Sequence, residues 1–440
     1  MTVTKSPHAD ARAATVRPGR PLSGVIRVGG SKTATLILLA AAASTRRPVR
    51  LDNVPSDDDT LAMLTLIKSC GYHVARPVTS PDTVVMLPTP GRSSAPDLAQ
   101  ASRFRSSYYL VPVQLAAGGQ AALPWPPGVG AGDRRMELHF GVYKAFGDTV
   151  VLDEYGYRVR VEDHPRDEVQ IRLPCRSRSA SVAAIARAVM SQTPLQLRNP
   201  NLSTEVISLL GCLSGCGWRV GISKDLVTLG PPTYVQDCAL PWTVPGDKLT
   251  AGALACAIAA TGGAARIEGI HRRDVAPVVD ALRHLGVPTT EGPDAITVHA
   301  DQTHPTNRPL LTTASLNPQG LDSDLQPALI AVALGMPGIH TFADAINPRR
   351  HSEVLSQLTQ LGAEFDEISP FQCRLTGPQR LTGGTVQTSG DFGTGSALLV
   401  AGLTARGTTT VTGLDRFRQE HTDLPAALRR LGADITEVPR

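Results

Sequence analysis

The strongest constraint on this chain is a unit that recurs six times along its 440 residues. In each copy a helix-like stretch ends in a glycine and a β-rich stretch follows, as in ISLLGCLSGCGWRV and VLSQLTQLGAEF. A glycine can adopt the left-handed conformation that ends a helix, so this order is sound local chemistry. The marker glycines, separated by 76, 70, 69, 76 and 70 residues on subtraction of their numbers, are Gly71, Gly147, Gly217, Gly286, Gly362 and Gly432.

A second pattern lies between the markers. It is an Ala-rich helix, a short break at Gly or Pro, and a β-branched strand, as in SALLVAGLTARGTTTV. These helices are apolar nearly all round, which predicts that they are buried. Each repeat therefore contains helix, strand, helix and strand, and it is longer than a solenoid unit. The six copies are Leu36–Val54, Tyr108–Leu123, Val182–Leu197, Thr250–Ile267, Leu325–Phe342 and Ser396–Val411.

Composition excludes several function classes. The length favours two or three domains. A net charge of +4 without a basic block argues against a nucleic-acid or membrane-surface protein. Aromatic residues make up only 4%, which argues against base stacking. No apolar run approaches the length of a membrane span, and the first residues lack the apolar core of a signal peptide.

The seven cysteines form no CxxC pair. This scattered set predicts reduced, buried thiols and a cytoplasmic protein. The nearest pair, Cys212 and Cys216, has no histidine close by, so we expect no metal site there. We also expect no cofactor and a monomer, and we expect residues 1–15 to be a disordered lead-in.

Six passages, in this order, resemble the enolpyruvyl transferase family. They are PLSGVIRVGGSKTATLILLAAAAS, LDNVPSDDDTLAML, GDRRMELH, PGDKLTAGALACAIA, LDSDLQPALIAVAL and SGDFGTGSALLVAGLTARGTTTV. The resemblance runs from about Arg17 to Ile435. It is closer to the UDP-N-acetylglucosamine enolpyruvyl transferases than to the 5-enolpyruvylshikimate-3-phosphate synthases.

The resemblance implies an α/β fold of the inside-out barrel type, with two domains of three β/α repeats each. The N-terminal domain would span residues 25–240, and the C-terminal domain would combine residues 16–24 with 241–440. Thr233–Pro245, which contains two prolines, is a plausible crossover linker.

The family reaction transfers the enolpyruvyl group of phosphoenolpyruvate to a hydroxyl and releases phosphate. It needs cations for the acidic substrate, a base for the hydroxyl and an acid for C3. Lys32 lies in the turn GGSKTA before an Ala-rich helix, where backbone N–H groups favour an anion. The resemblance implies that Lys32 binds phosphoenolpyruvate, as the matching lysine of the family does. The alternative is that Lys32 is a solvated lysine at the start of a helix. The family usually has Asn at the next position, which is Thr33 here.

Several arginines match family positions. Arg134 matches the arginine of the mobile loop, and Arg105 matches one at a helix start, although Arg103 offers another alignment. Either Arg416 or Arg418 matches the C-terminal arginine that binds phosphoenolpyruvate. An arginine can bind a carboxylate or phosphate through two hydrogen bonds. The further substrate-binding residues that the match implies are Arg135, Leu138, Arg349 and Asp391.

Asp324 in LDSDLQ matches the family aspartate near the attacking hydroxyl. A carboxylate within hydrogen-bond reach can accept that proton. The alternative is an N-cap for the helix LQPALIAVAL, a role for which Asp322 also competes.

Two further departures from the family concern the chemistry of the reaction. The loop LPWPPGVGAGDRRMELH lacks the family's acidic cysteine, and Gly393 stands where the family has an arginine that holds the phosphate of the intermediate. Both departures make ordinary cell-wall synthesis a weaker prediction.

Ser177, Arg178 and Ser179 match positions that hold the uridine phosphates. They precede the helix SVAAIARAVM, a good start for an anion site. Arg178 replaces a small or apolar residue, and an added cation suits a terminal phosphate; the alternative is an arginine that points into solvent. We therefore expect phosphoenolpyruvate and a uridine nucleotide, favouring uridine monophosphate, as in nucleoside-antibiotic biosynthesis. The alternatives are UDP-N-acetylglucosamine as acceptor and a nucleotide-binding paralogue without turnover.

Overall fold

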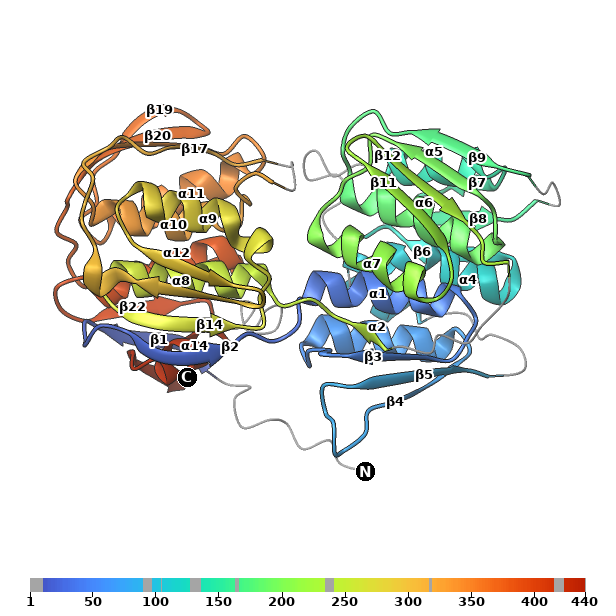
Figure 1. The fold of residues 1–440 in the computed structure, drawn as a ribbon, viewed down its shortest axis with the longest axis horizontal. Helices are drawn as coiled ribbons and strands as arrows, with labels where there is room; N and C mark the ends of the chain where they lie inside the picture. Colours follow the sequence, from blue (N-terminus) through green and yellow to red (C-terminus); the bar gives the residue numbers. More distant parts are fainter. Residues whose placement is uncertain are drawn as a thin grey trace. The chain divides into compact units, whose positions relative to one another are not determined.

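The computed structural model describes residues 11–89, 97–103, 105–126, 136–162, 166–233, 241–315, 319–414 and 423–439. The chain forms two compact units (Figure 1). The N-terminal unit is Gly30–Pro245, and the C-terminal unit combines Met1–Gly29 with Gly246–Arg440. Each unit has its own cluster of buried apolar side chains.

The N-terminal unit contains three repeats in succession. Its helices are α1 (Lys32–Ser44), α2 (Asp58–Ser69), α3 (Leu98–Arg103), the 3₁₀ helix η1 (Arg105–Leu110), α4 (Val111–Gly118), α5 (Glu137–Ala145), α6 (Arg178–Ser191) and α7 (Thr204–Gly215). Its strands are β3 (Val49–Asp52), β4 (Tyr72–Ala75), β5 (Val84–Pro88), β6 (Gln120–Pro124), β7 (Thr149–Leu152), β8 (Gly156–Arg160), β9 (Val169–Arg172), β10 (Leu195–Arg198), β11 (Arg219–Ser223), β12 (Leu226–Gly230) and β13 (Trp242–Thr243).

The C-terminal unit repeats this plan three more times. Its helices are α8 (Lys248–Ala260), α9 (Arg272–His284), η2 (Ala300–Gln302), α10 (Gln326–Leu334), α11 (Pro348–Thr359), α12 (Phe392–Thr404) and α14 (Leu424–Arg430). Its strands are β1 (Ala11–Arg17), β2 (Ser23–Arg27), β14 (Ala264–Glu268), β15 (Thr289–Gly292), β16 (Ala295–His299), β17 (Leu311–Thr313), β18 (Gly338–Ala343), β19 (Asp366–Ser369), β20 (Gln372–Gly377), β21 (Thr385–Gln387), β22 (Thr409–Thr412) and β23 (Asp434–Pro439).

The six marker glycines all follow an outer helix, and all adopt positive φ. The values for Gly71, Gly147, Gly217, Gly286, Gly362 and Gly432 are 85°, 91°, 86°, 94°, 87° and 98°. Each ends its helix and leads into the strand that the pattern predicts: β4, β7, β11, β15, β19 or β23. The repeat is therefore confirmed, because a left-handed residue after a helix favours glycine.

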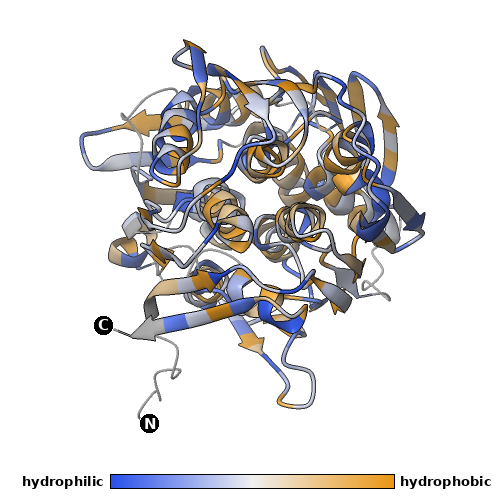
Figure 2. Cartoon of the chain, turned by 90° about the vertical axis from the view of Figure 1, so that its left-hand side faces the viewer, coloured by the Kyte–Doolittle hydropathy of each residue, from blue (hydrophilic) through white to orange (hydrophobic). Residues whose placement is uncertain are grey.

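The Ala-rich helices form the middle of each unit. Helices α1, α4 and α6 contact one another in the N-terminal unit, as do α8, α10 and α12 in the C-terminal unit. Every residue of α10 is buried, as is every residue of α12 from Phe392 to Leu403. Figure 2 shows helices in the middle and strands around them. The prediction of an inside-out α/β fold is thus confirmed.

The N-terminal segment departs from the sequence-based expectation. Residues 11–17 form strand β1, which lies between β22 and β23 in the sheet of the sixth repeat. The prediction of a disordered lead-in is wrong for residues 11–15, because antiparallel pairing with both neighbours satisfies the backbone of this segment. Its partners lie about 400 residues away in the chain, so no local signal identifies them.

The boundaries between the units also differ from the expected 24/25 and 240/241. Strand β2 continues to Arg27 because it pairs in parallel with β14, which belongs to the C-terminal unit. Strand β13 pairs with β3 of the N-terminal unit, and Val244 donates its N–H to Asp52. The chain consequently crosses between units at Gly29–Gly30 and Pro245–Gly246.

The described cysteines depart from the expectation of reduced, buried thiols at two positions, because Cys175 is exposed and Cys216 is not a free thiol. Cys70, Cys256 and Cys373 are buried thiols, and burial raises the pKa of Cys70 to about 11. Cys216, however, is disulfide-bonded, so the expectation of a wholly reduced set is wrong there. Among the described helices, none is both long enough and apolar enough to cross a membrane.

Candidate active site

Lys32 begins helix α1. The Ser31 side chain caps that helix by accepting a hydrogen bond from the N–H of Ala34. A Cβ on Gly30 would lie 1.9 Å from the carbonyl oxygen of Asn53, so only glycine fits before the cap. The Lys32 Nζ atom lies 2.9 Å from Oδ2 of Asp59, in the first turn of α2. The ammonium is thus held beside a helix N-terminus, with 17% of its side chain exposed. The lysine is therefore not simply a solvated surface charge.

The same local arrangement occurs at the start of helix α8. A Cβ on Gly246 would lie 1.8 Å from the carbonyl oxygen of Gly269, and Asp247 caps the helix. The next residue, Lys248, places Nζ 2.9 Å from Oδ2 of Asp322. Sequence reasoning did not select Lys248 as a site residue. The parallel between GGSK and PGDK, each before an Ala-rich helix, is the signal that could have identified it.

Three residues of the predicted acceptor site lie together at the start of α6. Ser177 caps the helix, and its Oγ lies 3.4 Å from that of Ser179. Arg178 is 41% exposed, and its Nη1 lies 3.4 Å from Oε1 of Glu205, whose side chain is 3% exposed. Arg178 is therefore anchored at one end by a buried carboxylate while its side chain remains open to solvent.

Two other predicted residues lie around the buried His139. Arg105 is the first residue of η1. The pKa of His139 is lowered to about 4, mainly because the ring is buried and to a smaller extent because Arg105 is positively charged. The ring of His139 lies 5.1 Å from that of Tyr108. Leu138 is half-buried and packs against the core of the N-terminal unit. Thr33, predicted to contact the acceptor, is half-buried in the first turn of α1.

In the C-terminal unit, Asp324 and Asp391 are brought together by Arg350. One Nη of Arg350 lies 2.5 Å from Oδ1 of Asp324, and its Nε lies 2.8 Å from Oδ2 of Asp391. Asp391 also caps α12 by accepting a hydrogen bond from the N–H of Thr394. Helix α10 has no side-chain cap, so the N-cap interpretation of Asp324 is not supported.

The arginine of this cluster is the neighbour of Arg349, the residue that the sequence match indicated for substrate binding. Arg349 is exposed on α11, whereas Arg350 is buried and contacts both aspartates. Consecutive residues of a helix point about 100° apart, so only one of the two can face α10 and α12. The structure therefore places Arg350, and not Arg349, against Asp324 and Asp391, and the substrate contact of Arg349 stays a prediction.

The predicted residues Arg134, Arg135, Arg416 and Arg418 lie outside the described residues. Within the described ranges, no group of three His, Cys, Asp or Glu side chains could hold a metal ion.

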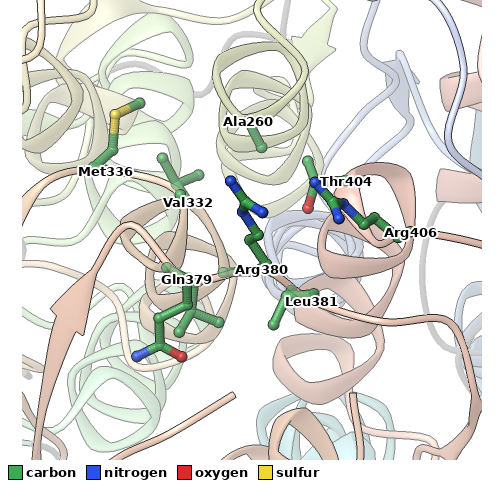
Figure 3. A pocket seen from close by; sticks show the side chains of 11 residues that line it. Ala260, Val332, Met336, Gln379, Arg380, Leu381, Thr404 and Arg406 are labelled. Atoms are coloured by element: carbon green, nitrogen blue, oxygen red, sulfur yellow. The ribbon is translucent and has the colours of Figure 1, made fainter. Parts of the chain in front are cut away.

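A cavity of about 230 Å³ lies at the other end of the central helices of the C-terminal unit (Figure 3). It is lined by residues at the carboxyl ends of α8 and α10, including Ala260 and Leu334, together with Arg380 and Arg406. Asp324, Arg350 and Asp391 lie at the amino ends of α10 and α12 instead. The cavity is therefore separate from the aspartate cluster, and the carboxyl ends of helices disfavour an anionic ligand.

Comparisons with known proteins identify the family of this chain. The sequence model of the EPSP synthase (3-phosphoshikimate 1-carboxyvinyltransferase) family matches residues 16–428. The chain is 29% identical to UDP-N-acetylglucosamine 1-carboxyvinyltransferase 3 of Symbiobacterium thermophilum over 424 residues, 96% of each chain. It is 27% identical to the enzyme of the same name from Caldanaerobacter subterraneus, covering 96% of this chain and 98% of that one.

Solved structures show the same fold. The enolpyruvyl transferase NikO from Streptomyces tendae superposes with a TM-score of 0.80 at 21% identity, covering 98% of this chain and 100% of that one. EPSP synthase from Acinetobacter baumannii gives a TM-score of 0.76 at 17% identity, with the same coverage. Because the family match extends over almost the whole chain, this protein belongs to the EPSP synthase family and is an enolpyruvyl (1-carboxyvinyl) transferase.

Proposed function

We propose that this enzyme transfers the enolpyruvyl group of phosphoenolpyruvate to a hydroxyl of a uridine nucleotide that ends in a phosphate, such as uridine monophosphate. Phosphate is the second product. The proposed role is in secondary metabolism, in the biosynthesis of a nucleoside antibiotic.

The proposed chemistry has two stages. The acceptor hydroxyl oxygen bonds to C2 of phosphoenolpyruvate, its proton passes to a base, and C3 takes up a proton. The tetrahedral intermediate then breaks its C2–O bond to phosphate and loses a proton from C3, which restores the double bond. The first stage requires a carboxylate near the hydroxyl, and both stages require cations near the phosphate.

Asp324 is the proposed base. Its side chain is 35% exposed, so an acceptor in solution can reach it. The guanidinium of Arg350 beside it favours the ionised carboxylate, which is the form that accepts a proton.

Lys32 is the proposed cation for phosphoenolpyruvate. It lies at the positive end of the α1 dipole, where N–H groups of the first turn also favour an anion. Its present partner, Asp59, is a partly exposed carboxylate, and a trianionic substrate can compete with a single pair of this kind for the lysine.

The arrangement around Arg178 is the observation that carries the choice of acceptor. The buried Glu205 anchors the guanidinium of Arg178 beside the hydroxyls of Ser177 and Ser179, at the N-terminus of the 14-residue helix α6. This arrangement suits a terminal phosphate, which carries two negative charges. A bridged diphosphate spreads its charge and needs this added cation less.

The main alternative is UDP-N-acetylglucosamine as acceptor. The two relatives compared above carry that substrate in their names, and each is matched over 96% of this chain. Against it stand Gly393, where the resemblance expects an arginine, and the absence of cysteine from the sequence Leu123–His139.

An acceptor panel tests the proposal. Phosphate release from phosphoenolpyruvate is measured with uridine, uridine monophosphate, UDP, UDP-N-acetylglucosamine and shikimate 3-phosphate, and mass spectrometry identifies each product. The proposal expects the highest kcat/KM with uridine monophosphate. A higher value with UDP-N-acetylglucosamine would establish the alternative, and a higher value with shikimate 3-phosphate would contradict both. Nucleotide binding without release from any acceptor would favour a paralogue that has lost turnover.

A second experiment addresses the biological role. The gene is expressed in a bacterial strain depleted of its own UDP-N-acetylglucosamine enolpyruvyl transferase. The proposal expects no rescue of growth, with a known wall enzyme as the positive control. Rescue to the level of that control would overturn the assignment to secondary metabolism.

A further inference from the structure

The guanidinium of Arg350 uses each of its three nitrogens on a different side chain. Nη2 contacts Asp324, and Nε contacts Asp391. The third nitrogen, Nη1, donates a hydrogen bond to the Oγ of Ser323 at 2.9 Å. The Ser323 hydroxyl in turn donates to Oδ2 of the buried Asp344, at 2.6 Å. The arginine is therefore held in one orientation by groups on both sides of it.

Burial differs sharply among the members of this cluster. The Arg350 side chain is only 9% exposed, whereas Asp391 is 24% and Asp324 is 35% exposed. Burial lowers the pKa of Arg350, but the charges of Asp324, Asp391 and Asp344 outweigh this effect and raise it overall. The buried, permanently charged guanidinium of Arg350 thus contacts Asp324, which is more exposed to solvent than Asp391.

Gly393 makes room for this arginine. A Cβ at position 393 would lie 3.0 Å from Cδ of Arg350, 3.1 Å from Cγ of Pro327 and 3.2 Å from the carbonyl oxygen of Asp324. All three distances are shorter than ordinary carbon–carbon or carbon–oxygen contacts. Any side chain at 393 would therefore press on the stem of Arg350 and on the backbone of Asp324 together.

We propose that Arg350 is a positioning residue for the transfer reaction, which fixes the carboxylate of Asp324 for proton acceptance, and that Gly393 is a glycine because Arg350 occupies the adjacent space. This inference rests on the proposed function of Asp324 as the base. The physical reason is that a base must lie within hydrogen-bond reach of its proton, and a misplacement of about 1 Å can lower the rate 10²-fold.

The first test compares Arg350→Met, Arg350→Lys and a control, Arg374→Met, which removes an exposed arginine on β20. Each variant is assayed with whichever acceptor supports the fastest phosphate release by the wild type. Arg350→Met should lower kcat by about 10²-fold while the KM for phosphoenolpyruvate changes little. Arg350→Lys should recover part of the loss, and Arg374→Met should leave kcat within about twofold of the wild type, as surface substitutions usually do.

The pH profile separates a positioning role from a purely structural one. Among the described residues, Arg350 contacts the Asp324 carboxylate, and Asp391 and Asp344 are the other carboxylates that act on this arginine. Asp322 accepts a hydrogen bond from the N–H of Asp324 and pairs with Lys248. Removing the adjacent cation raises the pKa of Asp324, so the acidic limb of kcat/KM should move to higher pH in Arg350→Met. An unmoved limb with reduced folded protein would mean that Arg350 only stabilises the fold.

A double-mutant cycle tests the role of Gly393. Gly393→Ala should lower kcat in the wild type and should cause a smaller further loss in Arg350→Ala. That background lacks the Cδ atom that lies nearest to the added Cβ, while the contacts with Pro327 and the Asp324 carbonyl remain. Independent, multiplying losses would overturn the proposal.

The same double-mutant cycle can be measured through the melting temperatures of the four proteins, which requires no substrate. The loss caused by Gly393→Ala should be smaller in the Arg350→Ala background, and equal losses in both backgrounds would overturn the proposed fit of Gly393 to Arg350. If the wild type released no phosphate with any acceptor, the proposed function would fail while this measurement still tested that fit.

Discussion

Arg187 and Asp148 form a two-point ion pair inside the N-terminal unit. Nη2 of Arg187 lies 2.6 Å from Oδ1 of Asp148, and Nε lies 2.8 Å from Oδ2. Both side chains are almost fully buried, and the guanidinium lies over the ring of Phe146 at 5.0 Å from its centre. The pair joins the central helix α6 to the residue after the marker glycine Gly147, so it fixes one repeat of the unit onto the next.

Removing one partner of this pair should destabilise the protein strongly. We expect Asp148→Asn to lower the free energy of unfolding by about 3–5 kcal/mol, because it leaves a buried guanidinium without its counter-charge. Urea unfolding followed by circular dichroism measures this change. The double variant Asp148→Leu/Arg187→Met should recover much of the loss, and a double variant as unstable as the single one would contradict this explanation.

Two marker glycines offer a matched test of why the repeat needs glycine. Gly286 and Gly432 have φ of 94° and 98°, but a Cβ on Gly286 would lie 2.0 Å from the carbonyl oxygen of His304, whereas a Cβ on Gly432 meets nothing within 4 Å. We expect Gly432→Ala to cost about 1–2 kcal/mol from backbone strain alone. Gly286→Ala should cost several kcal/mol more, because the backbone carrying His304 must also move. Equal losses in urea unfolding would show that backbone strain alone explains both positions.

Lys32 should matter for turnover far more than for stability. We expect Lys32→Met to lower kcat/KM for phosphoenolpyruvate by about 10²–10³-fold, since it removes a preorganised charge from the proposed phosphate site. The pair with Asp59 is partly exposed, so its loss should change the unfolding free energy by less than about 1 kcal/mol. Lys68→Met, which removes an exposed lysine from the last turn of α2, is the control. Equal activity of the two variants would exclude Lys32 from the site.

His139 should make the protein sensitive to acid. Its pKa is lowered to about 4, mainly by burial, whereas the unfolded chain has the ordinary value of 6.5. The unfolded state therefore binds a proton first as the pH falls below 6.5, so stability is full above that pH and decreases towards pH 4. The shift corresponds to a loss of about 3 kcal/mol near pH 4. Urea unfolding at pH 7.5 and 4.5 should show a smaller decrease for His139→Leu than for the wild type; equal decreases would assign the effect to other groups.

Arg178 should discriminate acceptors by their phosphate. We expect Arg178→Ala to raise the KM for uridine monophosphate about tenfold and to leave the weak activity with uridine unchanged, since a charge-assisted contact contributes roughly 1.5–3 kcal/mol. Arg178→Lys, which keeps the charge beside Glu205, should show a smaller effect. A similar rise in KM for both acceptors would mean that Arg178 supports the helix start rather than the phosphate.

The short elements of this fold could be predicted because their signals are local. Gly217 and Gly362 adopt the left-handed conformation that their place after a helix indicates, and the Ala-rich helices are buried as their apolar faces require. Strand β1 could not be predicted in this way, since Ala14 pairs with Val411 and Glu437, which lie far along the chain.

The sequence by itself determined the sixfold order of helices and strands and indicated Lys32 and Asp324 as candidate site residues, because helix ends, apolar periodicity and a recognisable motif are contained in neighbouring residues. Only the tertiary structure decided that Arg350, and not Arg349, joins Asp324 to Asp391. Adjacent residues of a helix have the same sequence neighbourhood but point about 100° apart, so the packing of α11 against α12 selects between them.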